Sequence, residues 1–219
     1  SRKIIDASSI LWELRLIKSN AEIDKIKHIC KIASNSFENL PFLINKGDSE
    51  RDIAKKMKMD LISRGADSIP YLPVISGVGG VSQIISEPTN RVLKSGDVLF
   101  VDTGSTYDGY FCDFDRNYSI GKASKIVNDV YEILWIATEK AIEIAKPGLP
   151  LSDLWKIMVY LLNKYLPNDF SKGRLGHGFG LQLTEPHSIT FDNDMKLALN
   201  MVLTIEPSVE FKPGKMLVH

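Results

Sequence analysis

Hydrophobic residues recur every three or four positions along the first part of the chain, a spacing typical of an amphipathic α-helix. The stripe starts after Ser19, which stands three residues before Glu22, the spacing of a helix capping box. These signals predict a long helix after Ser19, and residues 2–18 are predicted to form an extended entry followed by a helical turn. The apolar stripe consists of Ile23, Ile26, Cys30, Ala33, Phe37 and Leu40.

Three further helices are predicted from the same kinds of signal. Ser49 is a candidate N-cap, and Gly65 is a candidate stop for the helix that it starts. Residues 121–147 carry a third apolar stripe that ends at a Pro-Gly pair. Ser152 opens a fourth helix, which Pro167 closes.

Shorter apolar runs between the helices predict β-strands. One run covers residues 98–101, and the stretches 173–188 and 200–211 also have strand-like composition. Two helices followed by strands occur twice along the chain. This order predicts an α+β fold with two similar halves, which share one curved antiparallel sheet with helices outside it.

Three aspartates lie where a core strand would not normally carry charge. Asp102 ends an apolar run, and a glycine-containing turn leads to a second strand with Asp113 and Asp115. Because alternate residues of a strand share a face, Asp113 and Asp115 point the same way, and the hairpin can direct Asp102 and Asp113 into one pocket. Burying an unpaired carboxylate is costly. These acids therefore need a cation, a base or a metal ion as partner.

Two residues near the end of the chain complete this pattern. His177 lies between glycines in the sequence GHGFG, which leaves room for other groups around its imidazole, and Glu206 ends a strand-like segment before a proline. Carboxylates with one imidazole suit manganese, iron, cobalt or zinc. Carboxylates can also bridge two such ions, and a two-metal pair can activate water.

Composition narrows the function classes. The 219 residues are 44% hydrophobic and carry 27 basic and 27 acidic side chains, so the net charge is zero. This balance gives no reason to expect a nucleic-acid or membrane partner. Two cysteines are too few for a disulfide framework and favour a reducing compartment, which predicts a cytoplasmic protein.

Several strings resemble the catalytic domain of the pita-bread metallohydrolases, the family of methionine aminopeptidase, Xaa-Pro aminopeptidase, prolidase and creatinase. They are ELRLIKSNAEI, VDTGSTYDGYFCDFDRN, LGHGFG and LTIEP. The resemblance implies the pita-bread fold and two divalent ions, either manganese, cobalt, zinc or iron. It implies that a metal-bound hydroxide attacks a scissile amide and that either Glu206 or a further glutamate ligand takes the proton. The implied metal ligands are Asp102, Asp113, His177 and Glu206.

The resemblance also predicts the domain boundaries. Residues 1–18 would be a linker from a missing N-terminal domain, and residues 19–219 would be a catalytic domain truncated at its C-terminal end. A last glutamate ligand is expected just after His219, so weak or absent metal binding is expected of this fragment. Members of the family often form homodimers, which makes a homodimer the expected assembly.

The chain departs from the family pattern near the expected active site. Thr184 stands seven residues after the ligand histidine, where the peptidases carry a second histidine. Thr184 is a candidate catalytic residue because it can donate one hydrogen bond, but a threonine is no acid near neutral pH. His187 is either a substitute catalytic group or an ordinary loop histidine. Asp115 replaces a threonine, and it either binds metal, supports the ligands by hydrogen bonds or pairs with neighbouring Arg116.

Three functional hypotheses follow. The first is a metal-dependent hydrolase resembling Xaa-Pro aminopeptidase or dipeptidase, with a small peptide as substrate. The second, suggested by the missing histidine at the position of Thr184, is a creatinase-like or lyase-type enzyme on a small non-peptide molecule. The third is a catalytically inactive pita-bread binding module.

Overall fold

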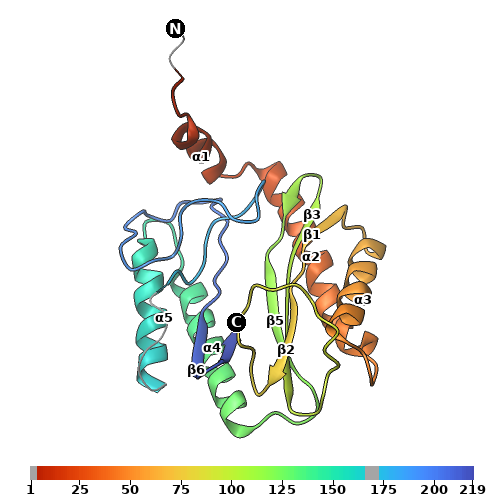
Figure 1. Ribbon diagram of the computed structural model, residues 1–219. Helices are drawn as coiled ribbons and strands as arrows, with labels where there is room; N and C mark the ends of the chain where they lie inside the picture. The colour runs from red at the N-terminus through yellow and green to blue at the C-terminus, as the bar shows by residue number, and fades with distance from the viewer. Residues whose placement is uncertain (1–3, 166–172) are drawn as a thin grey trace.

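The structure is a computed structural model that describes residues 4–165 and 173–219, in which helices flank a central sheet (Figure 1). Its elements in chain order are α1 (Ser8–Leu16), α2 (Asn20–Leu43), α3 (Glu50–Ser63), β1 (Ser68–Tyr71), β2 (Val74–Val78), β3 (Asp97–Tyr107), β4 (Tyr110–Phe111), β5 (Phe114–Ser119), α4 (Lys125–Ile144), α5 (Leu151–Tyr165), β6 (Ser208–Lys212) and β7 (Lys215–Val218).

Strand β3 organises the main sheet because every other strand of that sheet pairs with it. β1 and β2 pair with β3 in antiparallel register, and so do β4 and β5. Its side chains alternate between two cores: Leu99 and Val101 face the α2 and α3 side, whereas Val98 and Phe100 pack with residues of the other half. Asp102 continues the second alternation, so its place on the strand turns it toward the second half.

The first two long helices start and pack as the sequence predicts. Ser19 and Ser49 each close a capping box with the third helical residue, Glu22 in α2 and Asp52 in α3. Both helices bury their apolar faces on the same side of the sheet, which Figure 1 shows as the orange helices beside β1 and β3. The capping prediction is therefore confirmed.

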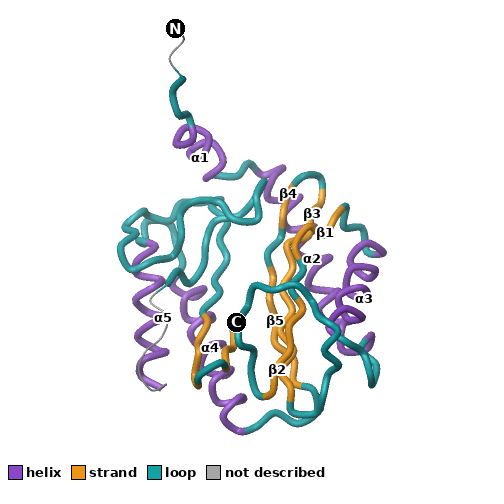
Figure 2. The backbone as a smooth tube through the Cα atoms, in the orientation of Figure 1, coloured by secondary structure: helices purple, strands orange, loops and turns teal. Residues whose placement is uncertain are grey.

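The second half consists of α4 and α5 packed against β6 and the loops before it (Figure 2). Ser124 caps α4, within the predicted range 121–147. α5 begins at Leu151, one residue earlier than predicted, so Ser152 lies inside the helix and donates a hydrogen bond to Asp194 instead of opening the helix. Pro167, expected to close this helix, lies outside the described residues.

The predicted single sheet is divided in the structure. β6 and β7 form a separate two-stranded sheet. One isolated bridge, Val81 to Met216, joins it to the loop after β2. The strand-like stretches 173–188 and 200–206 form no regular strand and pair through isolated bridges, Gly178 with Glu185 and Gly178 with Leu203. The α+β pita-bread class is nevertheless confirmed by the structural similarity given below.

Helix α1 projects from the body of the molecule and buries none of its residues (Figure 1). The stretch after it returns to the body at Lys18, which is 4% exposed. Across residues 4–165 and 173–219, every helix is too short or too polar to serve as a membrane span.

Candidate metal centre

Three of the predicted ligands converge at the junction of the two halves. Nε2 of His177 lies 3.3 Å from Oδ2 of Asp113 and 3.3 Å from Oε1 of Glu206. One ligand atom from each residue falls within 4.8 Å of the others. The imidazole is 3% exposed and the Asp113 side chain 8% exposed. This is a partly enclosed group of two carboxylates and one imidazole, gathered from segments about 30 to 90 residues apart in the chain.

Backbone pairing positions His177 and Glu206 beside each other. The backbone N–H of Thr204 donates to the carbonyl of His177 at 2.8 Å, and Glu206 N–H donates to Leu175 at 3.0 Å. Between them, Gly176 has a φ of +150°, and a Cβ there would collide with the Thr204 carbonyl. The glycine before the histidine is therefore needed so that the two segments can approach.

A carbonyl on the far side of the ring orients His177. Nδ1 lies 2.8 Å from the carbonyl oxygen of Gly178, which can only accept a hydrogen bond, so Nδ1 carries a proton. Burial lowers the pKa of His177, but Asp113, the Gly178 carbonyl and Glu206 outweigh it and raise that pKa above the usual value. The second nitrogen, Nε2, is the one that faces the two carboxylates.

Asp102 lies in the same region but outside the group formed by Asp113, His177 and Glu206. Its Oδ1 is buried without a hydrogen-bond partner. Burial, followed by the charges of Asp113, Asp115 and Glu206, raises the pKa of Asp102 well above its usual value. Burial and the Asp102 carboxylate also raise the pKa of the Tyr71 hydroxyl.

Asp115 stands directly opposite Asp102 in the β3–β5 register, so the two side chains share a face of the sheet. Asp115 is 9% exposed, and its Oδ1 also has no partner. Burial, with Glu206 and Asp113 adding to it and Arg116 opposing it, raises the pKa of Asp115 to about 7. Arg116 does not pair with this carboxylate; its Nη1 donates to the Asp115 backbone carbonyl at 2.6 Å.

This donor set fits divalent cations. Asp102 and Asp115 each leave a buried carboxylate oxygen without a partner, and the carboxylates raise one another's pKa values. Such crowding of carboxylates is unfavourable without a cation, and a bound cation relieves it. Oxygen ligands with one imidazole match manganese, iron, cobalt or zinc.

A cavity of about 390 Å³, the central cavity, opens beside the ligand group. Its walls come from β5, α4 and the segment before β6, and the apolar part of the lining includes Phe114, Ile142 and Phe179. The acidic part includes Asp113, Asp115, Glu139 and Glu206. A small molecule that enters it would meet the ligand group at one wall.

The raised pKa of Asp115 gives a testable pH dependence. Folded Asp115 keeps its proton up to about pH 7, whereas the unfolded residue loses it near pH 3.9. The folded state therefore binds more protons between these values, and metal-free stability falls as pH rises through that window. We expect Asp115→Asn to remove this loss, so that its unfolding free energy exceeds the parent's by on the order of 3 kcal/mol at pH 8.

Urea unfolding in EDTA at pH 4 and pH 8 measures this difference. The two proteins should be nearly equal at pH 4, where both side chains are uncharged. If the unfolding free energies of the parent and Asp115→Asn differ by the same amount at both pH values, the prediction is contradicted.

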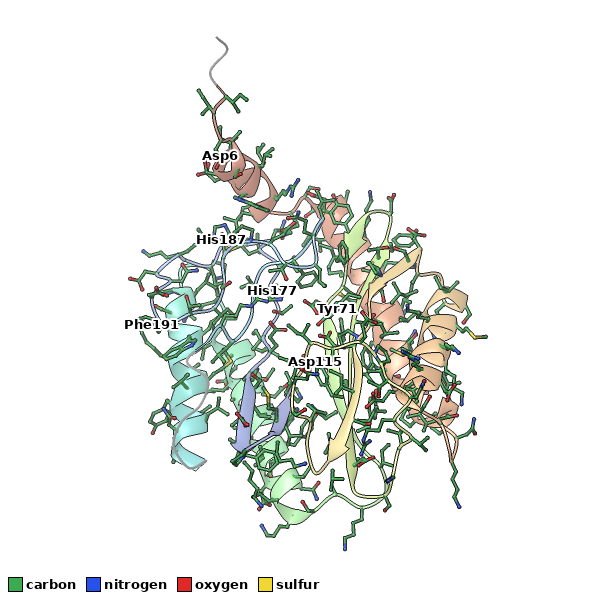
Figure 3. The ribbon with its side chains drawn as sticks, viewed as in Figure 1. Asp6, Tyr71, Asp115, His177, His187 and Phe191 are labelled. Carbon is green, nitrogen blue, oxygen red and sulfur yellow. The ribbon has the colours of Figure 1, made fainter. Side chains whose placement is uncertain are left out.

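The two other residues expected to be catalytic lie elsewhere. Thr184 is exposed. His187 borders a separate small cavity with Lys18 and Glu185, and burial followed by the Lys18 charge lowers its pKa. In Figure 3, His187 lies between the N-terminal segment and His177, whereas Tyr71 and Asp115 lie on the other side of His177. Neither Thr184 nor His187 belongs to the ligand group.

Sequence reasoning did not identify two residues around the centre. Tyr71 borders Asp102, but one tyrosine between prolines gives no signal in the sequence. Glu185, between the two expected catalytic residues, is 5% exposed and pairs with Lys18 across 167 positions. A contact over that distance requires the fold to be known.

Comparison with known proteins agrees with this arrangement. The chain is 28% identical over 200 residues to a Xaa-Pro dipeptidase of Pyrococcus furiosus, covering 91% of this chain and 58% of that protein. It is 29% identical over 209 residues to an uncharacterized peptidase of Staphylococcus aureus, covering 95% and 59%. The chain thus spans about three fifths of the length of these relatives.

Solved structures of peptidases are also similar to this chain. An X-Pro aminopeptidase of Thermotoga maritima superposes with a TM-score of 0.91 at 31% identity, covering 99% of this chain and 62% of that one. The prolidase of Pyrococcus furiosus gives a TM-score of 0.90 at 27% identity, covering 97% and 63%.

The fold and the ligand group together define a domain of the metallopeptidase class. The model of metallopeptidase family M24 matches residues 24–219, and the chain belongs to that family.

Proposed function

We propose that the protein is a metal-dependent hydrolase that cleaves Xaa-Pro peptides. The observation that carries this proposal is the convergence of Asp113, His177 and Glu206 within 4.8 Å beside a cavity of peptide size. The Xaa-Pro enzymes among its relatives support the substrate class. Asp102 and Asp115 supply the additional carboxylates that would hold a second ion.

The chain's own groups would bind, orient and move a proton. Two divalent ions at this position would polarise a scissile carbonyl and make bound water a better nucleophile. Glu206 is suited to take the proton from that water, because it is one quarter exposed at the cavity wall and burial raises its pKa. His177 would bind through Nε2, and the apolar wall residues would hold the ring of a proline.

The substrate prediction can be tested directly. We expect the full-length protein, loaded with manganese, to hydrolyse Gly-Pro or Ala-Pro at least about 100-fold faster than Gly-Ala, because only the proline ring fills the apolar wall. Hydrolysis followed by released amino acid measures this ratio. Elemental analysis of the same sample should find about two ions per chain, which would exclude the inactive binding module. Manganese-loaded protein that leaves the proline peptides intact would contradict the peptidase proposal.

One observation favours a second candidate, a hydrolase or lyase for a small non-peptide compound. The histidine that lines the central cavity, His219, has its pKa lowered to about 4 by burial and by Arg116. It is therefore neutral at pH 7 and a poor proton donor to a peptide leaving group. A metal-loaded protein that is inactive on peptides but active on small C–N compounds would support this candidate.

A further inference from the structure

Lys18 and Glu185 form a buried ion pair outside the group of ligand candidates. Nζ of Lys18 lies 3.0 Å from Oε2 of Glu185, and the side chains are only 4% and 5% exposed. Removing both charges from water is costly, so such a pair is weak evidence for a purely stabilising role. Its hydrogen-bonded neighbours suggest a more specific one.

The Glu185 end is connected to His177 through a single carbonyl. The Gly178 oxygen accepts the backbone N–H of Glu185 at 2.7 Å, and the same oxygen lies 2.8 Å from Nδ1 of His177. Oε1 of Glu185 also accepts the N–H of Leu181 at 3.0 Å. The carboxylate thereby closes the turn of residues 178–185 that presents the Gly178 carbonyl to the imidazole.

The Lys18 end is connected to the segment that carries Glu206. The backbone N–H of Lys18 donates to the carbonyl of Asn200 at 3.0 Å. The chain continues from Asn200 to Thr204, whose hydroxyl accepts the backbone N–H of His177 at 2.9 Å. Lys18 thus joins the stretch between α1 and α2 to both segments that carry ligand candidates.

Little space is left around the pair. A Cβ on Gly180 would lie 2.9 Å from Cε of Lys18 and 3.2 Å from Oε1 of Glu185. His187 completes the surroundings, and the cavity that it shares with the pair measures only about 10 Å³. Displacing the pair would therefore move the turn that contacts the imidazole.

We propose that Lys18 and Glu185 are positioning residues for His177. They hold the Gly178 carbonyl so that the imidazole keeps its proton on Nδ1 and directs the Nε2 lone pair to Asp113 and Glu206. A metal ion binds only the unprotonated nitrogen of a neutral imidazole, so this inference rests on the proposed metal centre. The stretch before α2 is then part of the centre although it supplies no ligand.

Nitrogen-15 NMR of the imidazoles tests this proposal in the metal-free chain. Spectra are recorded at increasing pH until the ring signals stop shifting, so that the imidazole is neutral, and His177→Gln identifies which signals belong to His177. The parent should show the proton on Nδ1. Lys18→Met should give a mixture of tautomers, and Lys18→Arg should restore the parent pattern. Lys56→Met, which breaks the partly buried Lys56–Asp48 pair of the other half, is the matched control and should leave the pattern unchanged.

Metal affinity provides the second measurement. Loss of a group that orients a ligand typically weakens binding about 10- to 100-fold, so Lys18→Met should bind manganese that much more weakly than Lys56→Met. Gly180→Ala keeps both charges while displacing the pair, and it should give the same loss if Lys18→Met does not fold.

The outcomes separate the two proposals. If Lys18→Met and Gly180→Ala keep the tautomer pattern and the manganese affinity of the parent, the positioning role is overturned. A shifted tautomer in a chain that binds no manganese would support the positioning role and count against the proposed function.

Discussion

In the full-length protein, Asp113→Ala is expected to abolish manganese binding at the candidate centre and to reduce hydrolysis by at least about a thousandfold. Asp113 and Glu206 both lie 3.3 Å from His177 Nε2, and Asp113 also raises the pKa values of Asp102 and Glu206. Its removal takes away the group most central to the ligand set. Metal catalysis contributes several kcal/mol, and each 1.36 kcal/mol corresponds to about a factor of ten in rate.

The same substitution should not unfold the metal-free chain. It removes one negative charge from a group of buried like charges, so the free energy of unfolding in EDTA should be no lower than the parent's. Asp24→Ala, at an exposed position of α2, is the control and should keep both metal content and rate. Metal content by elemental analysis, activity and urea unfolding are measured on both variants. Full activity in Asp113→Ala would exclude the proposed centre.

The sequence predicts the helices well because their signals are local. A capping serine, an acid three residues later and an apolar stripe all lie within a few turns, so α2 and α3 could be placed from Ser19 and Ser49. The second sheet was less predictable. Whether residues 200–211 join the main sheet depends on the contact of Val81 with Met216, which are 135 positions apart, and no local pattern encodes it.

The residues of the candidate site also divide into those with a local signal in the sequence and those whose role depends on long-range contacts. Asp102 and Asp113 could be proposed from strand alternation, and His177 and Glu206 from their glycine and proline neighbours. The motif resemblance supplied their joint role. The buried Lys18–Glu185 pair could not be predicted this way. In the sequence, Lys18 looks like the polar end of a helix and Glu185 like an acidic residue of a loop. Burial of a charge becomes visible only when distant segments are packed together.

Glu50→Ala is expected to give the largest loss of stability, about 4 kcal/mol, because it removes the acceptor of four donors, two of which are buried. Oε1 of Glu50 accepts the N–H and hydroxyl of Ser76, at 2.7 and 2.6 Å. Oε2 accepts the N–H and hydroxyl of Thr89, at 3.0 and 2.6 Å. Glu50 is 3% exposed and Ser76 9% exposed, so water cannot replace the carboxylate at Ser76, whereas the exposed Thr89 can turn its donors to solvent. Each buried donor left without a partner costs about 1–3 kcal/mol.

Two further variants make this result specific. Glu50→Gln keeps one oxygen as an acceptor and presents an NH₂ group to the other pair of donors, so about half the loss is expected. Glu132→Ala, at an exposed position of α4, removes an equal charge from a helix and should change the free energy of unfolding by less than about 0.5 kcal/mol. Urea unfolding at pH 7 measures all three.

Equal losses for Glu50→Ala and Glu132→Ala would mean that the four hydrogen bonds contribute nothing beyond the helix itself. The graded series predicted here instead makes Glu50 the link that fixes the start of α3 to β2, the strand beside the one that carries Asp102.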